Sequence, residues 1–175
     1  KHLLQTLQWS FTFMVAVEHC NPSIGMSARI WMDRVNSSKP FAWDIEVSEC
    51  KLSLRVPGAK GEAVTASLVA NEWRHLTVIT EDTNFNPSKD LNFDPSQRNW
   101  KFRSRLIIDD AGEVGSIEGK VRAGTMLWES SRLCLTNDLP DSADFAQIYL
   151  FNRRLDDEEV TFIRQRSIVD RNEGH

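Results

Sequence analysis

The sequence predicts an all-β fold, an antiparallel β-sandwich with one short helix near the C-terminus. The strongest observation is the strict alternation of residues 8–18, which is typical of a strand with one well-buried face. Several shorter segments repeat this two-residue period and are separated by turn residues. Residues 145–160 then combine an alternating strand, a tight corner and the signals of a helix start. The apolar face expected for residues 8–18 carries Trp9, Phe11, Phe13, Val15 and Val17.

Length and composition place the chain among folded globular proteins. Its 175 residues suit a single domain spanning residues 1–175, and 41% apolar with 26% charged residues exclude disorder. The net charge of −4 and the pI of about 5.6 argue against a nucleic-acid partner, which needs a basic face. No apolar run is long enough to span a bilayer, so membrane insertion is not expected. Because the chain begins at Lys1 without Met, we expect a fragment of a larger protein.

Period-two patterns predict the order of strands along the chain. The short link at residues 48–49 predicts a hairpin between two of them. The polar insertion at residues 84–100, which contains Pro87 and Pro95, is expected to be a mobile surface loop. The expected strands lie at residues 8–18, 27–33, 43–47, 52–56, 64–68, 72–82, 105–114 (as strand, turn and strand), 133–135 and 146–150.

The helix start is predicted by a capping box and a hydrophobic staple, which together fix the direction in which the chain leaves the last strand. The capping box is formed by Asp156 and Glu159, and the staple by Leu155 and Val160. We expect a short helix near residues 157–166 that packs on the rim of the sandwich. A tail is expected at residues 171–175.

Four motifs occur in the order in which laminin G and pentraxin domains carry them. They are Trp73-Arg74-His75-Leu76, the turn Ile108-Asp109-Asp110-Ala111-Gly112, the strand Leu133-Cys134-Leu135, and Asn152-Arg153-Arg154-Leu155-Asp156 followed by Glu159-Val160. Residues 9–163 therefore resemble the laminin G/pentraxin-like domains of the concanavalin A-like lectin/glucanase superfamily. The resemblance implies a jelly-roll sandwich. It does not select a function, because that superfamily contains lectins, protein-binding adhesion modules and glycosidases.

Aromatic and polar residues in loops or on outer faces are the candidate ligand-binding residues. Tryptophan rings can stack on sugars, while Asn and Asp can hold hydroxyl groups. We expect a non-catalytic recognition module that binds a glycan or a protein through rim loops or a sheet face. An alternative is a structural domain that packs against neighbouring domains of its parent protein, because an open sheet edge invites pairing. The candidates are Trp31, Trp43, Trp100, Asn137 and Asp138.

A glycoside hydrolase is a second alternative, and it depends on the alternate positions Asp44, Glu46 and Ser48. Jelly-roll glucanases carry an acid at all three positions, so that nucleophile and general acid face one sugar cleft. Here Ser48 replaces the third acid and Glu49 has the wrong parity, so we expect two solvated carboxylates and no catalytic residues. His75 lacks a nucleophile with a recognisable motif, and the resemblance of its Trp-x-His motif implies a structural histidine near the sheet surface. The chain is therefore not expected to be an enzyme.

The resemblance raises the possibility of a calcium site, because pentraxins bind calcium in a loop that corresponds to residues 136–138. Asn137, Asp138 and Asp141 are weak candidate ligands, but no complete set of oxygen ligands can be assembled from the motifs. We therefore expect no metal and no other cofactor. The histidines show no ligand spacing that would support zinc.

Three widely spaced cysteines predict neither a dense disulfide framework nor a Cys-x-x-Cys metal site. Cys20, Cys50 and Cys134 are expected to be buried or half-buried thiols, and a single disulfide is the alternative. The sequence does not indicate a compartment.

Overall fold

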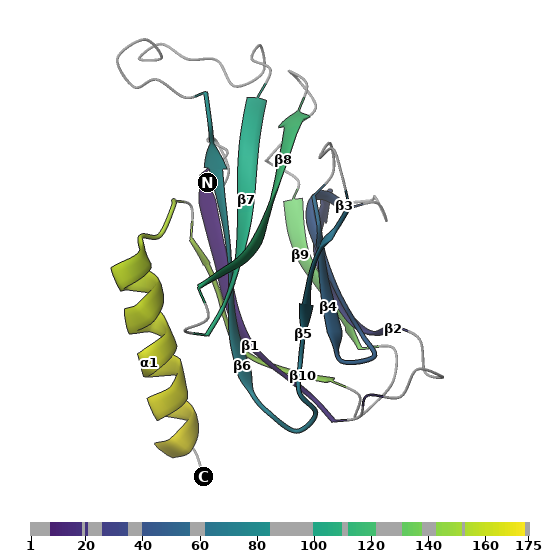
Figure 1. The fold of residues 1–175 in the computed structure, drawn as a ribbon, viewed down its shortest axis with the longest axis vertical. Coiled ribbons are helices and arrows are strands. Elements are labelled where there is room, and N and C mark those ends of the chain that lie inside the picture. The colour runs from purple at the N-terminus through teal and green to yellow at the C-terminus, as the bar shows by residue number, and fades with distance from the viewer. Residues whose placement is uncertain are drawn as a thin grey trace.

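The computed structural model of the chain describes residues 8–18, 20, 26–34, 40–56, 62–84, 100–109, 112–121, 131–137, 143–151 and 153–173. Two five-stranded antiparallel sheets face each other, and a helix, α1, lies against the outer side of one of them (Figure 1). Sheet A has the strand order β10-β1-β6-β7-β8, and sheet B has the order β5-β4-β3-β2-β9. The predicted all-β sandwich with a C-terminal helix is confirmed. The elements are β1 Trp9–Val17, β2 Met26–Arg34, β3 Pro40–Ser48, β4 Lys51–Arg55, β5 Val64–Ser67, β6 Arg74–Asp82, β7 Trp100–Ile108, β8 Glu113–Val121, β9 Ser131–Asn137, β10 Ala143–Phe151 and α1 Asp157–Glu173.

β1 pairs with β10 on one side and β6 on the other, and it is buried on both faces. Its alternating apolar residues, including Phe11 and Phe13, join the core between the sheets, as predicted. The sequence predicts only this one buried face, yet Ser10, Thr12 and Met14 on the other face are also buried. The reason is α1, which covers the outer side of sheet A and removes water from it (Figure 1).

The predicted capping box starts α1. The Glu159 backbone N–H donates to Asp156 Oδ1 at 2.8 Å, and the Asp156 backbone N–H donates to Glu159 Oε2 at 3.1 Å. Arg153 Nη1 also donates to Glu159 Oε2 at 2.7 Å. This side-chain hydrogen bond is the main reason that the pKa of Glu159 is lowered to about 2. Arg153 and Asp156 of the corner are therefore both bonded to Glu159 in the first turn of the helix.

α1 packs on the face of sheet A and not on the rim, which corrects the prediction. The staple residues Leu155 and Val160 are buried in one cluster with Ile79 of β6 and Ile107 of β7. The helix also runs beyond the predicted end to Glu173, because it contains neither Pro nor Gly. Within the described part of the chain, no helix is long and apolar enough to cross a membrane.

β10 departs from the alternation that its sequence predicts. The register with β1 shifts between Thr12 and Met14, and Gln147 has a positive φ of 51°, so the strand contains a bulge. The extra residue changes which side chains face the core. Phe145 and Leu150 pack against the core, whereas Ile148, predicted to share a face with Leu150, is 36% exposed.

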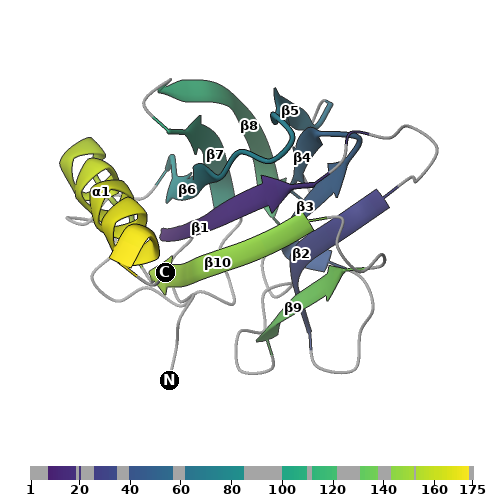
Figure 2. The same ribbon diagram turned by 90° about the horizontal axis from the view of Figure 1, so that it is seen from below.

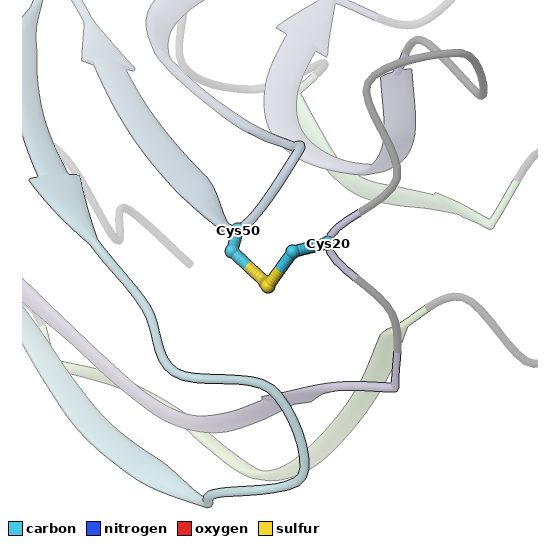
Figure 3. Close-up of a disulfide and its surroundings, with 2 residues drawn as sticks. All are labelled: Cys20 and Cys50. Carbon is cyan, nitrogen blue, oxygen red and sulfur yellow. A yellow bond between two sulfur atoms is a disulfide. The ribbon is translucent and has the colours of Figure 1, made fainter.

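The predicted hairpin between β3 and β4 turns at Glu49 and Cys50. Both have positive φ, 53° and 57°, which is the combination found in type I′ turns. Cys50 is bonded to Cys20, which follows β1 (Figure 3), while Cys134 is half-buried and is not part of this disulfide. The disulfide therefore ties the end of a strand of sheet A to a hairpin of sheet B.

His75 is buried on the same side of β6 as Ile79. Its Nε2 lies 2.6 Å from Thr12 Oγ1 of β1. Burial is the main cause that lowers the pKa of His75 from 6.5 to about 4; the nearby Asp109 carboxylate raises this pKa and the Arg164 guanidinium lowers it. The imidazole is therefore neutral at pH 7.

Loss of the disulfide should destabilise the sandwich. The two cysteines are 30 residues apart, and removing a cross-link that closes a loop of this length lowers the free energy of unfolding by about 3.6 kcal/mol. Urea unfolding of Cys20→Ala/Cys50→Ala should show this loss, and Cys134→Ala should show much less. Titration of three free thiols in the unreduced protein would contradict the pairing.

Acid should destabilise the protein through His75. Between pH 6.5 and about 4 the unfolded chain binds a proton at this residue and the folded protein does not, so stability falls as the pH drops through this window. The full loss is at most about 3 kcal/mol. Urea unfolding across this range should show a shallower pH slope for His75→Gln than for the wild type. Equal slopes would contradict the assignment.

Candidate functional site

A cavity of about 710 Å³ lies where sheet A, sheet B and α1 come together. Its wall is formed by the edge strand β5, the start of β6, the turn between β7 and β8, and the C-terminal half of α1. We call it the Trp73 cavity. Its volume falls in the range of known ligand sites, roughly 300–1,000 Å³. It is lined by Thr65, Ala66, Ser67, Trp73, Arg74, Ile108, Asp109, Val114, Arg164 and Ile168.

Asp109 is held by three hydrogen bonds at the edge of this cavity. Its Oδ2 accepts a hydrogen bond from Arg74 Nη1 at 2.8 Å, and its Oδ1 accepts one from the His75 backbone N–H at 2.9 Å. Its own backbone N–H donates to the His75 carbonyl oxygen at 2.9 Å. Asp109 has a φ of 44°, a left-handed conformation that Asp tolerates better than most residues. The carboxylate is therefore held in one orientation beside Arg74.

The charges around the cavity balance. Arg74 Nη2 lies 3.5 Å from Glu72 Oε2 in addition to its contact with Asp109. Arg74, Arg164 and Asp109 line the cavity, and Glu72, which is outside the lining, contacts Arg74. The cavity offers both donors and acceptors without a strong net charge.

The apolar part of the lining comes from different elements. Trp73 is half-buried directly before β6, and Ile108 is the buried last residue of β7. Val114 of β8 is 42% exposed and Ile168 of α1 is 37% exposed. The lining therefore combines apolar and polar side chains, as is typical of sites for organic ligands.

Close packing of two edge strands supports the cavity. A Cβ atom at Gly115 of β8 would lie 2.9 Å from Cγ1 of Val64 in β5. Only glycine allows this approach, because real Cβ contacts essentially never reach so short a distance. The edges of the two sheets therefore meet beside Val114 and Thr65, which line the cavity.

A second, smaller cavity of about 340 Å³ lies at the N-terminal half of α1 and shares Asp109. Its polar lining includes Arg105 and Glu113, and its helix side includes Asp157. Glu113 already binds Arg103, whose Nη2 lies 2.9 Å from Glu113 Oε1. None of the described residues that line this cavity is aromatic.

The sequence-predicted binding residues are divided between the sheets. Trp31 in β2 is in register with Asp44 and Cys134, and Trp43 lies in the neighbouring β3. Asn137 ends β9, while Asp138 and Asp141 lie outside the described residues. Among the described residues, no group of three or more His, Cys, Asp and Glu could hold a metal ion.

Trp100 is placed differently from the prediction. The sequence assigns it to the end of a polar loop, but it is the first residue of β7 and is in register with Val121 of β8. It belongs to sheet A, so its backbone is separated from Trp31 and Trp43, which are in sheet B. The rest of the predicted loop, residues 85–99, lies outside the described residues.

The carboxylates considered for glycoside hydrolysis lie on β3. Glu46 Oε2 is 3.1 Å from Arg55 Nη1, and Ser48 is in register with Lys51 of β4. Asp44 is only 6% exposed, so the expectation of two solvated carboxylates is wrong for this residue. None of the three lines the Trp73 cavity.

Sequence reasoning did not select the Trp73 cavity, although two of its motifs were visible. Trp73 and Arg74 belong to the Trp-x-His motif, and Asp109 belongs to the turn motif before Gly112. The sequence does not reveal that these two motifs lie side by side in the fold, or that Arg164 of α1 lies beside them. Their separation along the chain hides this.

No family model matches the sequence, and no curated protein matches it. Among solved structures, a receptor-binding domain is similar with a TM-score of 0.57 and 13% identity, covering 94% of this chain and 36% of that chain. The binding domain of botulinum neurotoxin DC in complex with rat synaptotagmin II gives 0.57 and 15%, covering 92% and 36%. The botulinum neurotoxin type G receptor-binding domain gives 0.52 and 12%, covering 94% and 38%. This chain spans little more than a third of those structures, and the likeness shows a shared β-sandwich fold.

Proposed function

We propose that the chain is a non-catalytic recognition module of a larger protein and that its ligand binds in the Trp73 cavity. The observation that carries this proposal is the cavity itself. It places a half-buried tryptophan next to a fixed arginine–carboxylate pair, Arg74 and Asp109. A recognition site combines an apolar surface with a few well-placed polar groups in this manner.

The similar structures support the proposal at the level of the fold. Two of them are described as receptor-binding domains, and one is in complex with a protein, rat synaptotagmin II. A fold is shared by many functions, so these names only raise the expectation of a binding role. The site must carry the argument.

The contacts between carboxylates and arginine side chains support a non-catalytic role. Asp109 and Glu72 both contact Arg74, and Glu46 on the other sheet contacts Arg55. Glycosidases need two carboxyl groups facing one sugar, one of them able to donate a proton.

The alternative of a structural domain is favoured by the exposed apolar residues on edge strands. Leu135 on β9 is 47% exposed, and Ile148 and Tyr149 on β10 are 36% and 42% exposed. β9 and β10 are the outermost strands of their sheets on the same side of the sandwich (Figure 2). A neighbouring segment of the parent protein could pack on that side.

A binding assay that compares a cavity-filling variant with a control variant tests the proposed function. We expect the chain to bind members of a printed glycan array or of a displayed random-peptide library. Ser67→Trp, which fills the cavity from an exposed position on β5, should weaken that binding at least about tenfold. Phe162→Ala, at an exposed helix residue outside the cavity lining, should leave it unchanged.

Two results would contradict the proposal. One is an absence of binding in both probe sets for a protein that melts cooperatively. The other is hydrolysis of β-glucan oligomers that Glu46→Gln abolishes, since that would make the chain an enzyme.

A further inference from the structure

We infer that the Trp73 cavity takes a short, uncharged oligosaccharide, by stacking a sugar ring on Trp73 and holding hydroxyl groups between Arg74 and Asp109. This inference rests on the proposed function and names the chemical class of its ligand. It differs from the sequence-based candidates for ligand binding, because neither Trp73 nor Arg74 was among them.

The balance of charge selects an uncharged ligand. Arg74 is shared between Asp109 and Glu72, at 2.8 and 3.5 Å, so its charge is compensated within the protein. A phosphate, sulfate or acidic peptide would meet Asp109 in the lining and would compete with both Asp109 and Glu72 for Arg74. A cation would meet Arg74 and Arg164. A neutral ligand avoids both conflicts.

The hydrogen-bonding groups suit hydroxyls in particular. A sugar hydroxyl donates one hydrogen bond and accepts others, so it needs donors and acceptors side by side. Each terminal nitrogen of Arg74 carries a second hydrogen beyond the contacts to Asp109 and Glu72, and each carboxylate oxygen of Asp109 has a second lone pair. The hydroxyls of Thr65 and Ser67 on the opposite wall can both donate and accept.

The indole ring of Trp73 suits the apolar face of a sugar ring. A pyranose ring presents C–H groups on one face and hydroxyls around its edge, so it fits an aromatic surface bordered by polar groups. Trp73 supplies the surface, and Arg74 is its neighbour in the chain. Ile108 and Val114 extend the apolar part of the lining. The 710 Å³ of the cavity leaves room for more than one ring.

Calorimetric titration with the strongest neutral oligosaccharide from a printed array of neutral, sialylated and sulfated glycans tests the inference. Trp73→Ala should weaken binding at least about tenfold, and Trp73→Phe should weaken it less because a ring remains. Asp109→Asn keeps a side chain that tolerates the left-handed backbone but removes the charged acceptor, and should weaken binding about tenfold. Phe162→Ala is the matched control.

Salt provides an independent readout. Affinity for the neutral glycan should change less than about twofold between about 0.05 and 0.5 M NaCl, because no net charge is neutralised. Thermal melting shows whether Trp73→Ala is as well folded as the wild type. If this variant is unfolded, the binding of Asp109→Asn and Ser67→Trp decides the question.

The outcomes separate the inference from the proposed function. Binding of peptides alone, blocked by Ser67→Trp, would overturn the sugar assignment and leave the recognition module standing. Binding only of sulfated or sialylated glycans with a steep loss in salt would also overturn it, since that would be an anion site. Neutral glycan binding that persists in folded Trp73→Ala and Asp109→Asn would place the sugar elsewhere. No binding to either probe set would remove both proposals.

Discussion

The burial of β1 on both faces is the constraint on which the rest of the structure depends. One face joins the core between the sheets, and the other carries Ser10 and Thr12, whose hydroxyl groups are cut off from water. Buried hydroxyls need hydrogen-bond partners inside the protein. Ser10 Oγ donates to the Arg153 carbonyl oxygen at 2.9 Å and accepts from the Leu155 backbone N–H at 2.9 Å. Ser10 of β1 thus binds the segment before α1, which is part of the layer that covers this strand.

This attachment determines where the helix side of the Trp73 cavity lies. The Ser10 contacts hold the chain immediately before α1, and the capping box at Asp156 and Glu159 starts the helix at a defined residue. A helix fixed at its first turn places each later residue by its regular rise and rotation. Arg164 and Ile168 therefore come to lie beside the β7–β8 turn. A polar contact at one end of the helix supports a cavity near its other end.

The parts of the fold that the sequence predicts are those set by local patterns. The capping box needs only Asp156 and Glu159 three residues apart, and the β1 core face needs only alternation. The bulge in β10 is different, because the positive φ of Gln147 follows from the register of this strand against β1. The local sequence around Gln147 contains no residue that predicts a bulge. The second buried face of β1 was hidden in the same way: Ser10 and Thr12 look like surface residues until the helix covers them.

The candidate site was harder to predict than the fold, because its residues come from both sheets and the helix.

Rigidity is what makes this assembled site suitable for recognition. Asp109 uses its backbone N–H and both carboxylate oxygens to bind His75 and Arg74, so its side chain is ordered before any ligand arrives. Ordering a side chain on binding costs about 0.5–1.5 kcal/mol, and a group that is already fixed avoids this cost. The same contacts join the start of β6 to the end of β7, so the residue that stabilises the strand ends also orients the polar part of the cavity. His75 connects this region to Thr12 on β1, and hence to the buried face beneath α1. The structural role of Asp109 and its proposed role in recognition are therefore compatible, because both require the carboxylate to stay in place.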